Sequence, residues 1–591
     1  MNPTEPILQA YREGQSALLL SGRSLYDFVA DNGRIRPLFE VLRRTLFREY
    51  GMVFISYSMA TGLNWFESWI PEEADRQTIR HLLRNNNLLD LPKTENEVVS
   101  VVRGVASLSR TNTENLKWKD GRQMRFAICF EFSEHLTPGG LTNGTQTDSQ
   151  LIVTELVHLT SQSLALRDSG NLILFHGRET LVDELVCSAL KRVHLLQPDK
   201  TEKEDFLTNA LNLYSDATFE NGLTPDAIVS LTINTPNRGI ENQLRASHRG
   251  KRILTAKEIS EQKNRDVEQL SEGTLRPLET SNMQNVRLVG KNVEKPNNIL
   301  MKLADCLLKG DPSMPANLLL AGAPGTAKTD LAKLVSFLGK SPAYEMISPK
   351  GSLVGETERK ARLQQQALKE WTPNVAFCDE ISESLPLERS EFDGDSGASR
   401  AVTATLLTAL SDETRRGKSL LIATTNRPWA MGAAMRSRFT VIPVLFPLKE
   451  DFPSIIVTTA QRIAPNSQLS ATDSQIIEAA NIFYQKGANP RHLRSALSNA
   501  LLLSGKSVIE PNDIFFAAHD LCATTDFAST VYADLWAIKC CTSRSFLPWS
   551  DAPSQYGFPD YLKGIVNEQT GEIDETELTK RIAELKPNAN V

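Results

Sequence analysis

An apolar stretch that runs into a glycine-bearing turn and then into a helix constrains this chain more than any other feature. The stretch is Asn317–Ala321, the turn is Gly322–Ala327, and Lys328 and Thr329 open an amphipathic segment that extends to Leu338. Glycines let backbone N–H groups curl around an anion, and a helix N-terminus adds positive potential. This order of strand, turn, Lys-Thr and helix is the context that a phosphate-binding loop requires.

The turn predicts a role for each of its polar side chains. We expect Lys328 to reach the β- and γ-phosphates of ATP and the Thr329 hydroxyl to bind Mg²⁺. Ala327 stands where glycine is usual, and its small methyl group should be tolerated. The alternative is a chance glycine-rich turn. The predicted nucleotide-binding residues of this segment are Gly322, Ala323, Pro324, Gly325, Thr326, Ala327, Lys328, Thr329 and Asp330.

Two further apolar strands end in polar side chains that ATP hydrolysis needs. Asp379 and Glu380 follow the strand Val375–Cys378. We expect Asp379 to hold Mg²⁺ and Glu380 to polarise the attacking water. The alternative is an acidic helix N-cap. Asn426 follows the strand Leu420–Thr424 and could orient that water, or it is an ordinary turn asparagine.

Three arginines are candidates for sensing the nucleotide. Arg436 and Arg438 could complete a neighbouring subunit's site in trans, as an arginine finger does. Their alternative is a solvated or salt-bridged surface pair. Arg491 follows Gly487-Ala-Asn-Pro, and its alternative is a helix-start arginine.

Residues from about 295 to 520 resemble an AAA+ ATPase module. The matching elements are Walker A (Gly322–Thr329), Walker B (Asp379, Glu380), sensor 1 (Asn426), the arginine-finger region (Arg438, Arg436) and sensor 2 (Arg491). The resemblance implies a P-loop α/β wedge with a helical lid, ATP and Mg²⁺ as ligands, and a homo-hexameric ring. Leu353–Glu358 resembles the first pore loop of the AAA subfamily, but Leu353 replaces the usual aromatic residue, which argues against strong processive threading.

The two halves of the chain repeat one pattern, which indicates a duplication. The alternative is an unrelated α/β recognition domain in the first half. The matching pairs are Arg238–Leu244 with Arg491–Leu497, Lys251–Ile259 with Lys506–Ile514, and Pro198 with Pro447.

The first half lacks the residues of ATP chemistry. The loop after the strand Met52–Ser58 has one glycine and no lysine, and Phe132 follows Glu131 where a catalytic glutamate belongs. Ala189 stands in the place of Arg438. We therefore expect a copy that keeps the fold and does not hydrolyse ATP. This layout resembles a tandem AAA family of cyanobacterial and chloroplast genomes, with a degenerate first module and an active second one.

The chain has 591 residues, too many for one hydrophobic core, and apolar β-rich runs alternate with helical patterns, as in α/β proteins. Trp536, Trp549, Tyr556 and Tyr561 lie near its end, and we expect them to pack onto the lid. The predicted parts are a degenerate AAA-like domain with its lid (1–274), a linker (275–296), an ATPase wedge (297–450), a helical lid (451–521) and a C-terminal helical extension (522–591).

Composition narrows the class of partner and the compartment. The net charge of −6 gives no general attraction to nucleic acid or an anionic membrane. No apolar run reaches the length of a membrane span, no signal peptide is evident, and the seven scattered cysteines fit reduced thiols, so we expect a cytoplasmic location. We expect ATP-driven remodelling of a protein partner. The alternatives are a nucleic-acid motor or loader, which the acidic balance disfavours, and a nucleotide-gated switch or scaffold.

Overall fold

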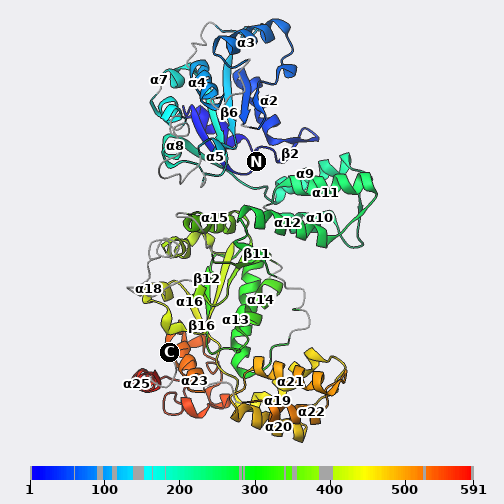
Figure 1. Ribbon diagram of the computed structural model, residues 1–591, viewed down its shortest axis with the longest axis vertical. Coiled ribbons are helices and arrows are strands. Elements are labelled where there is room, and N and C mark those ends of the chain that lie inside the picture. The colour runs from blue at the N-terminus through cyan, green and yellow to red at the C-terminus, as the bar shows by residue number, and fades with distance from the viewer. Residues whose placement is uncertain are drawn as a thin grey trace. The chain divides into compact units, whose positions relative to one another are not determined.

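The computed structural model divides into two compact units, Met1–Asp266 and Val267–Val591, which are described separately (Figure 1). The division falls inside a helix, ahead of the predicted linker 275–296. The described residues are 3–58, 60–89, 97–109, 116–137, 152, 154–162, 164–179, 182–233, 235–278, 283, 287–338, 341–348, 356–384, 404–522 and 527–586.

The first unit contains a six-stranded sheet of order β5-β4-β6-β7-β1-β8, in which only β5 runs antiparallel to its neighbour. Alternate residues of β1 enter opposite cores, with Leu18 and Leu20 on one face and Ala17 and Leu19 on the other. The strands are β1 (Ala17–Gly22), β4 (Met52–Ser58), β5 (Gly62–Asn64), β6 (Arg125–Glu131), β7 (Leu172–His176) and β8 (Lys191–Leu195). A separate hairpin pairs β2 (Phe28–Asp31) with β3 (Arg34–Pro37).

Helices accompany this sheet, and a second helical group with its own core follows it as a lid. The helices of the sheet domain are α1 (Glu5–Arg12), α2 (Leu38–Tyr50), α3 (Glu73–Asn85), α4 (Glu97–Ser109), α5 (Ser133–Leu136), α7 (Leu164–Ser169) and α8 (Glu184–Ala189). The lid consists of α9 (Lys200–Leu213), α10 (Pro225–Thr232), α11 (Asn237–Gly250) and α12 (Ala256–Leu270), with the short strands β9 (Thr218–Phe219) and β10 (Ile253–Leu254).

The second unit has a six-stranded sheet of order β11-β13-β14-β15-β12-β16, again with one antiparallel edge strand, β11. Its strands are β11 (Leu275–Pro277), β12 (Asn317–Ala321), β13 (Ala343–Met346), β14 (Asn374–Cys378), β15 (Ser419–Thr425) and β16 (Thr440–Pro443). Its wedge helices are α13 (Lys291–Lys309), α14 (Lys328–Leu338), α15 (Glu356–Glu370), α16 (Ile381–Ser384) and α18 (Ala433–Arg436). The lid helices are α19 (Phe452–Ile463), α20 (Ser474–Gln485), α21 (Pro490–Ser504) and α22 (Pro511–Asp520).

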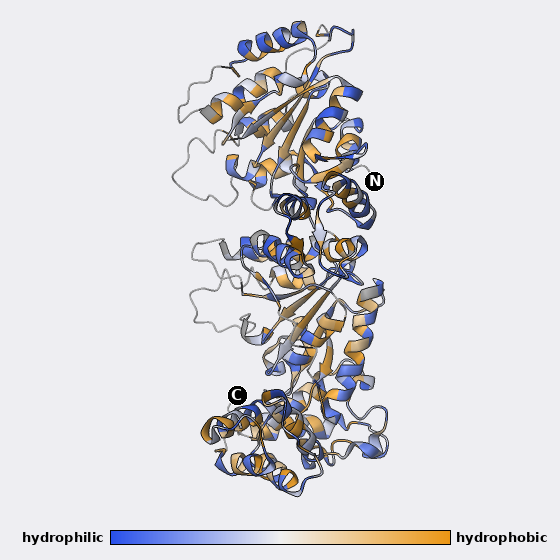
Figure 2. Ribbon diagram, turned by 90° about the vertical axis from the view of Figure 1, so that its right-hand side faces the viewer, coloured by the Kyte–Doolittle hydropathy of each residue, from blue (hydrophilic) through white to orange (hydrophobic). Residues whose placement is uncertain are grey.

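The two sheets have the same strand order when each is followed from its last parallel strand. The first runs β8-β1-β7-β6-β4-β5 and the second runs β16-β12-β15-β14-β13-β11. Each ends in the antiparallel strand. Figure 1 shows the strands at the centre of each unit with helices around them, and Figure 2 shows that the strands are apolar whereas the helices carry both apolar and polar residues. The predicted duplicated α/β fold is confirmed.

One strand correspondence predicted from the sequence is wrong. Met52–Ser58 was expected to match the phosphate-loop strand Asn317–Ala321, but β4 lies where the second unit has β13. The counterpart of β12 is β1, which pairs with β7 and β8 as β12 pairs with β15 and β16. The true first-half loop is therefore Gly22–Pro37, and it also has no lysine.

The predicted packing of the C-terminal aromatic residues on the lid is wrong, because they pack mainly on the wedge, although Phe527 also contacts Phe446 of the lid core. The C-terminal extension contains α23 (Phe527–Cys540), α24 (Pro553–Tyr556) and α25 (Glu575–Leu585). Trp549 and Tyr556 are buried in one core with strand residues such as Leu319 and Val441, and Trp536 and Tyr561 pack against that core. The lid has a separate core of its own.

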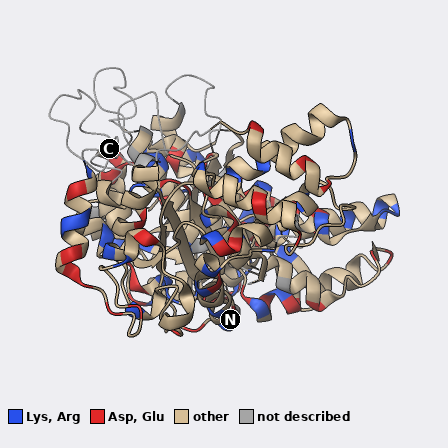
Figure 3. Cartoon of the chain, turned by 90° about the horizontal axis from the view of Figure 1, so that it is seen from below, with Lys and Arg blue, Asp and Glu red and all other residues tan. Residues whose placement is uncertain are grey.

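Both basic and acidic positions occur along the helices drawn in Figure 3. Among the helices that the structure describes, none is long and apolar enough to cross a membrane.

Gly22 and Gly322 stand at the ends of the corresponding strands β1 and β12, and each lies close to the chain of the neighbouring edge strand. A Cβ on Gly22 would lie 2.5 Å from the Leu195 carbonyl oxygen, and one on Gly322 would lie 2.0 Å from that of Val444. Gly22 has a φ of +87°, and Gly14 has a φ of +85° with open space around it.

We expect Gly22→Ala to lower the free energy of unfolding by about 2–4 kcal/mol, because steric overlap adds to left-handed backbone strain. Gly14→Ala should cost only about 1 kcal/mol, since it has the strain alone. Denaturant unfolding of both variants measures the difference. Equal losses would show that the close approach of the two strands does not constrain this position.

Candidate nucleotide site

A cavity of about 900 Å³ lies between the wedge and the lid of the second unit. The phosphate loop, the ends of β14 and β15, and helices α19 and α21 line it. Among the predicted site residues, those in the lining are Gly325, Thr326, Ala327, Lys328, Thr329, Asp330, Asp379, Glu380, Asn426 and Arg491. Gly322, Ala323 and Pro324 are absent from the described lining and form the base of the loop.

Lys328 begins α14 and folds back into the loop that precedes it. Its ammonium group donates to the carbonyl oxygens of Gly322 (2.9 Å) and Ala323 (2.7 Å) and to the side-chain oxygen of Asn426 (2.6 Å). Burial lowers the pKa of Lys328 to about 8, while the carboxylates of Glu380, Asp534 and Asp379 act in the opposite direction. The acceptors in these bonds are neutral oxygens, which a phosphate group could replace without displacing a carboxylate.

The residues after β14 and β15 meet because carboxyl ends of parallel strands share one edge of the sheet. The Thr424 hydroxyl donates to Asp379 over 2.5 Å. The backbone N–H of Asn426 donates to Glu380 over 3.1 Å, and the Asn426 side-chain amide donates to the same carboxylate. Asn426 thus joins Lys328 to Glu380, the pair that would bracket the terminal phosphate and its attacking water.

The loop backbone approaches the lid closely. Gly325 has a φ of +77°, and a Cβ there would lie 2.6 Å from the side chain of Asn489, which caps α21. Ala327 also has a left-handed φ of +70°, the conformation for which glycine is usual at this position. The alanine keeps the glycine-like backbone and adds a methyl group that packs against the neighbouring core.

The donor set fits Mg²⁺. Hard oxygen ligands are what this ion prefers, and it usually takes one or two protein groups together with phosphate oxygens and water. The Thr329 hydroxyl and the Asp379 carboxylate line the same cavity. No cluster of three or more His, Cys, Asp or Glu side chains suited to a metal occurs in the part of the chain that is described.

The candidate arginines have different surroundings. Arg436 points inward, donates to the carbonyl oxygens of Pro428 and Met431, and lies 5.9 Å from the ring centre of Trp536. Arg438 donates to Ser411 over 2.9 Å in an exposed setting. Neither is among the described residues lining the cavity of its own chain. The predicted pore-loop residue Leu353 lies outside the described residues.

Sequence analysis missed five basic or amide side chains that line the cavity, among them Gln461 of α19. Arg494 follows Arg491 by about one helical turn on α21, so the spacing could have indicated it. Arg462 of α19 lies 3.4 Å from Asp330. Arg287 and Asn292, which precede and begin α13, had no recognisable signal in the sequence.

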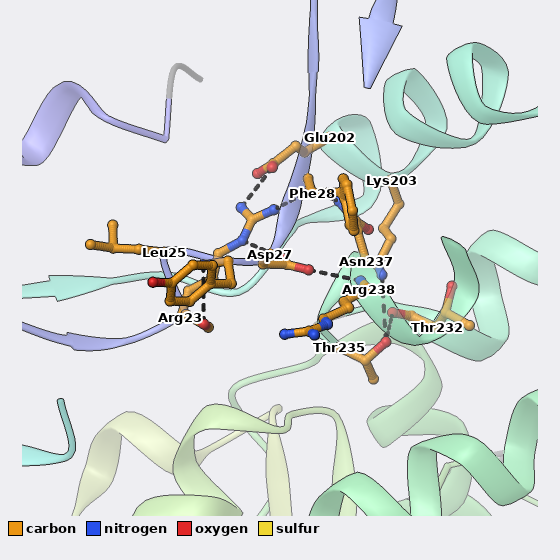
Figure 4. Close-up of polar contacts among 12 residues, drawn as sticks. Arg23, Leu25, Asp27, Phe28, Glu202, Lys203, Thr232, Thr235, Asn237 and Arg238 are labelled. Atoms are coloured by element: carbon orange, nitrogen blue, oxygen red, sulfur yellow. Dashed lines mark hydrogen bonds and ion pairs between the residues drawn. The ribbon is translucent and has the colours of Figure 1, made fainter. Parts of the chain in front are cut away.

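The corresponding place in the first unit is filled by an internal ion-pair cluster (Figure 4). Arg23 follows Gly22 at the end of β1 and is fully buried. Its guanidinium donates to Asp27 over 2.7 Å and to Glu202 of lid helix α9 over 2.6 Å. The wedge and the lid of this unit are therefore joined by a buried charge pair.

Two more hydrogen bonds connect the wedge of the first unit to lid helix α11. The backbone N–H of Arg238 donates to Asp27 over 2.8 Å, and the Asn237 side chain donates to the Phe28 carbonyl over 2.7 Å. Arg238 is the residue predicted to match Arg491. Beside this joint, burial lowers the pKa of Lys203 to about 7, and its ammonium group lies 3.5 Å from the Thr235 hydroxyl.

At the Walker B counterpart of the first unit the backbone conformation is the same, but a phenylalanine replaces the glutamate. Phe132 and Glu380 both take a left-handed φ, +54° and +45°, directly after Glu131 and Asp379. Tyr26 donates its hydroxyl to Glu131, and its ring stacks on Phe132 with centres 6.4 Å apart. Tyr26 of the first unit's own loop thus contacts both residues that stand at the positions of Asp379 and Glu380.

Comparison with known proteins supports both modules. Residues 318–445 match the model of the ATPase family associated with various cellular activities (AAA), and residues 7–188 match that of the AAA+ chaperone N-terminal Rossmann-like domain.

Similar proteins include the ATPase family gene 2 protein of Schizosaccharomyces pombe, 37% identical over 124 residues, which are 21% of this chain and 15% of that protein. The cell division cycle protein 48 homolog of Archaeoglobus fulgidus is 33% identical over 153 residues, 26% of this chain and 20% of the homolog. The nuclear valosin-containing protein-like protein of Mus musculus is 40% identical over 119 residues, which are 19% of this chain and 13% of that protein. The chain thus spans a fifth or less of the length of each of these relatives.

The family matches fall on the same two segments in which the strand order is repeated, and the second of them contains the Walker motifs. The second half of the chain therefore contains an AAA ATPase domain, and the first half contains a domain that matches the Rossmann-like domain of AAA+ chaperones.

Proposed function

We propose that this protein binds and hydrolyses ATP in its second module and uses the resulting motion to remodel a protein partner. The observation that carries the proposal is the hydrogen-bonded series Lys328, Asn426 and Glu380 at the edge of the AAA sheet. It brings a phosphate-binding cation, a water-orienting amide and a general base to one cavity.

Each residue of the series has one role. Lys328 exchanges its carbonyl partners for the β- and γ-phosphates, and loop N–H groups bind the remaining phosphate oxygens. Glu380 accepts the proton of the attacking water, which Asn426 orients. Mg²⁺ held by Thr329 and Asp379 would neutralise charge on the transferred phosphoryl group. Arg491 lies on the lid helix α21, so binding of the phosphates draws the lid toward the wedge.

Remodelling follows from where the cavity lies. A nucleotide between wedge and lid converts its hydrolysis into a change of their relative orientation. We propose a homo-hexameric ring in which Arg438 serves the neighbouring site, since its side chain lies away from its own cavity. The match of the first half to a domain of AAA+ chaperones supports a protein partner. We also propose a cytoplasmic location, a reducing compartment with which seven free cysteine thiols are compatible.

Glu380→Gln should bind ATP but hydrolyse it about 10²–10⁴-fold more slowly, because the amide cannot accept the proton. Glu131→Gln is the matched control in the first module and should leave turnover unchanged. Steady-state ATPase rates and bound nucleotide per chain measure both effects. We expect one nucleotide per chain in Glu380→Gln, and two would contradict a silent first module.

Arg438→Ala should bind ATP normally and hydrolyse it poorly if the arginine acts in trans. Mixing it with Lys328→Ala subunits should restore part of the activity, since one interface type then combines an intact site with an intact arginine. Arg416→Ala, which removes a surface arginine paired with Glu413, is the control and should keep full activity. The absence of any recovery on mixing would exclude a trans role.

We further propose that the first module works without nucleotide, because its own side chains hold wedge and lid together. Asp27 and Arg23 are 1% and 0% exposed, and Asp27 also receives the Arg238 amide. A phosphate group would have to displace carboxylates from Arg23, whereas at Lys328 it replaces neutral oxygens.

Asp27→Asn should destabilise the first unit by about 3–5 kcal/mol, the cost of leaving a buried ion pair incomplete. Glu73→Gln breaks an exposed ion pair with Arg76 and should cost no more than about 1 kcal/mol. Denaturant unfolding followed in the full chain gives both values, with ATP turnover below the transition unchanged. A loss of unfolding free energy in Asp27→Asn no larger than in Glu73→Gln would refute the proposal that buried side chains hold the wedge and the lid together.

A further inference from the structure

The two arginines predicted to act in trans differ in what holds them. Arg436 ends the short helix α18, and its guanidinium donates to the carbonyl oxygens of Pro428, over 3.3 Å, and of Met431. Both acceptors lie in the segment that connects Asn426, at the end of β15, to α18. Arg436 therefore binds this connecting segment to its own helix, whereas Arg438 lies two residues further along the chain in a more exposed setting.

The C-terminal helix α23 contacts the same segment. The ring centre of Trp536 lies 5.9 Å from the Arg436 guanidinium, within the range of a cation–π interaction. One helical turn earlier, the ring of Tyr532 meets that of Trp429 edge-on, with centres 4.8 Å apart. Trp429 lies in the short helical turn η6 (Pro428–Ala430), which also accepts one of the Arg436 hydrogen bonds. α23 thus binds both the connecting segment and the arginine that closes it.

The position of Arg438 depends on α18, to which it is bonded. Its side chain donates to the carbonyl oxygen of Ala434 and to the hydroxyl of Ser411, and its backbone N–H donates to the carbonyl of Met435 over 3.1 Å. α18 is only four residues long. A single helical turn is not stable by itself and takes its position from tertiary contacts. The contacts that fix α18 therefore also fix the Arg438 guanidinium.

The first module lacks both arginines. In the register of the edge strands β8 and β16, Ala189 and Cys187 stand at the positions of Arg438 and Arg436. The module without the outward arginine is thus also without the inward one, as expected if the inward arginine serves the outward one.

A direct role of Arg436 at a neighbouring site would require the side chain to leave its present partners. The guanidinium would give up two carbonyl acceptors and the Trp536 ring. Hydrogen bonds to a charged group are among the stronger ones in proteins, so this exchange is costly. The inward orientation favours support of Arg438 over contact with a phosphate group.

We propose that Arg436, held by Trp536 of the C-terminal segment, is a positioning residue that fixes Arg438 for its task at the neighbouring subunit's ATP site. The C-terminal segment is then part of the structure through which one subunit acts on the next. This inference rests on the proposed trans role of Arg438.

Arg436→Lys keeps the charge and removes the planar group that joins two carbonyls to a ring. We expect kcat to fall at least about tenfold, because an arginine finger contributes about 10³–10⁵-fold and acts only from a fixed position. The KM for ATP should stay within about twofold, since the lining of the variant's own cavity is unchanged. Lys539→Ala, which removes an exposed cation 5.3 Å from the same Trp536 ring, is the matched control and should keep both constants.

Co-expression with Lys328→Ala subunits distinguishes a trans defect from damage to the variant's own site. Arg436→Lys should recover activity above the sum of the two separate proteins, because its intact ATP site then meets an intact arginine of the neighbouring subunit. A low kcat without such recovery would place the defect in the variant's own site and overturn the inference. An unchanged kcat in Arg436→Lys would overturn it as well.

Trp536→Leu tests the contribution of the C-terminal segment, and it carries the test if Arg436→Lys does not fold. Its kcat should fall about fivefold, the equivalent of one partly buried cation–π contact, with the same recovery on co-expression. Trp536→Phe keeps a ring and should stay within about twofold of wild type. A normal kcat in Trp536→Leu beside a low one in Arg436→Lys would make Arg436 act directly in trans and overturn the inference. Full activity of Arg438→Ala would instead refute the proposed trans arginine.

Discussion

The architecture of each unit depends on how closely the strand next to the sheet edge approaches the end of the edge strand. Gly22 and Gly322 end β1 and β12, and in each case a carbonyl oxygen of the adjacent segment occupies the space a side chain would need. A bulkier residue would push the following loop away from the sheet edge. Because parallel strands end at one edge, this single contact determines where the loop lies relative to the ends of the next two strands.

The two modules then differ in the partners they give to a buried cation. Lys328 is bound by carbonyl and amide oxygens, and its nearest carboxylates act at longer range. Arg23 is bound directly by Asp27 and Glu202. Neutral acceptors can be exchanged for phosphate at little electrostatic cost, whereas carboxylates cannot, since the guanidinium would lose a charge-assisted bond. The same fold thus gives the buried cation neutral partners in one unit and carboxylate partners in the other.

The sequence identified the catalytic half well, because its motifs are local. The predicted strand Asn317–Ala321 coincides with β12, and the residues from Gly325 to Asp330, which were predicted to bind nucleotide, line the cavity. In the first half the same reasoning chose the wrong strand. Ala17–Gly22 leads into the β2–β3 hairpin instead of directly into a helix, so its pattern does not resemble strand, turn and helix. Strand order is a property of tertiary pairing, and neither apolar periodicity nor glycine spacing records it.

Tertiary docking also explains why the C-terminal segment could not be interpreted from its composition. Its aromatic residues indicate burial but not the surface that buries them, and both the lid and the wedge offer apolar faces. Once α23 lies against β12 and β16, its polar residue at position 534 accepts the backbone N–H of Phe446 and the hydroxyl of Tyr561. A buried carboxylate needs such donors, because burying a charged group without partners is costly. Both donors come from segments distant in the sequence, so composition alone could not indicate how the segment docks.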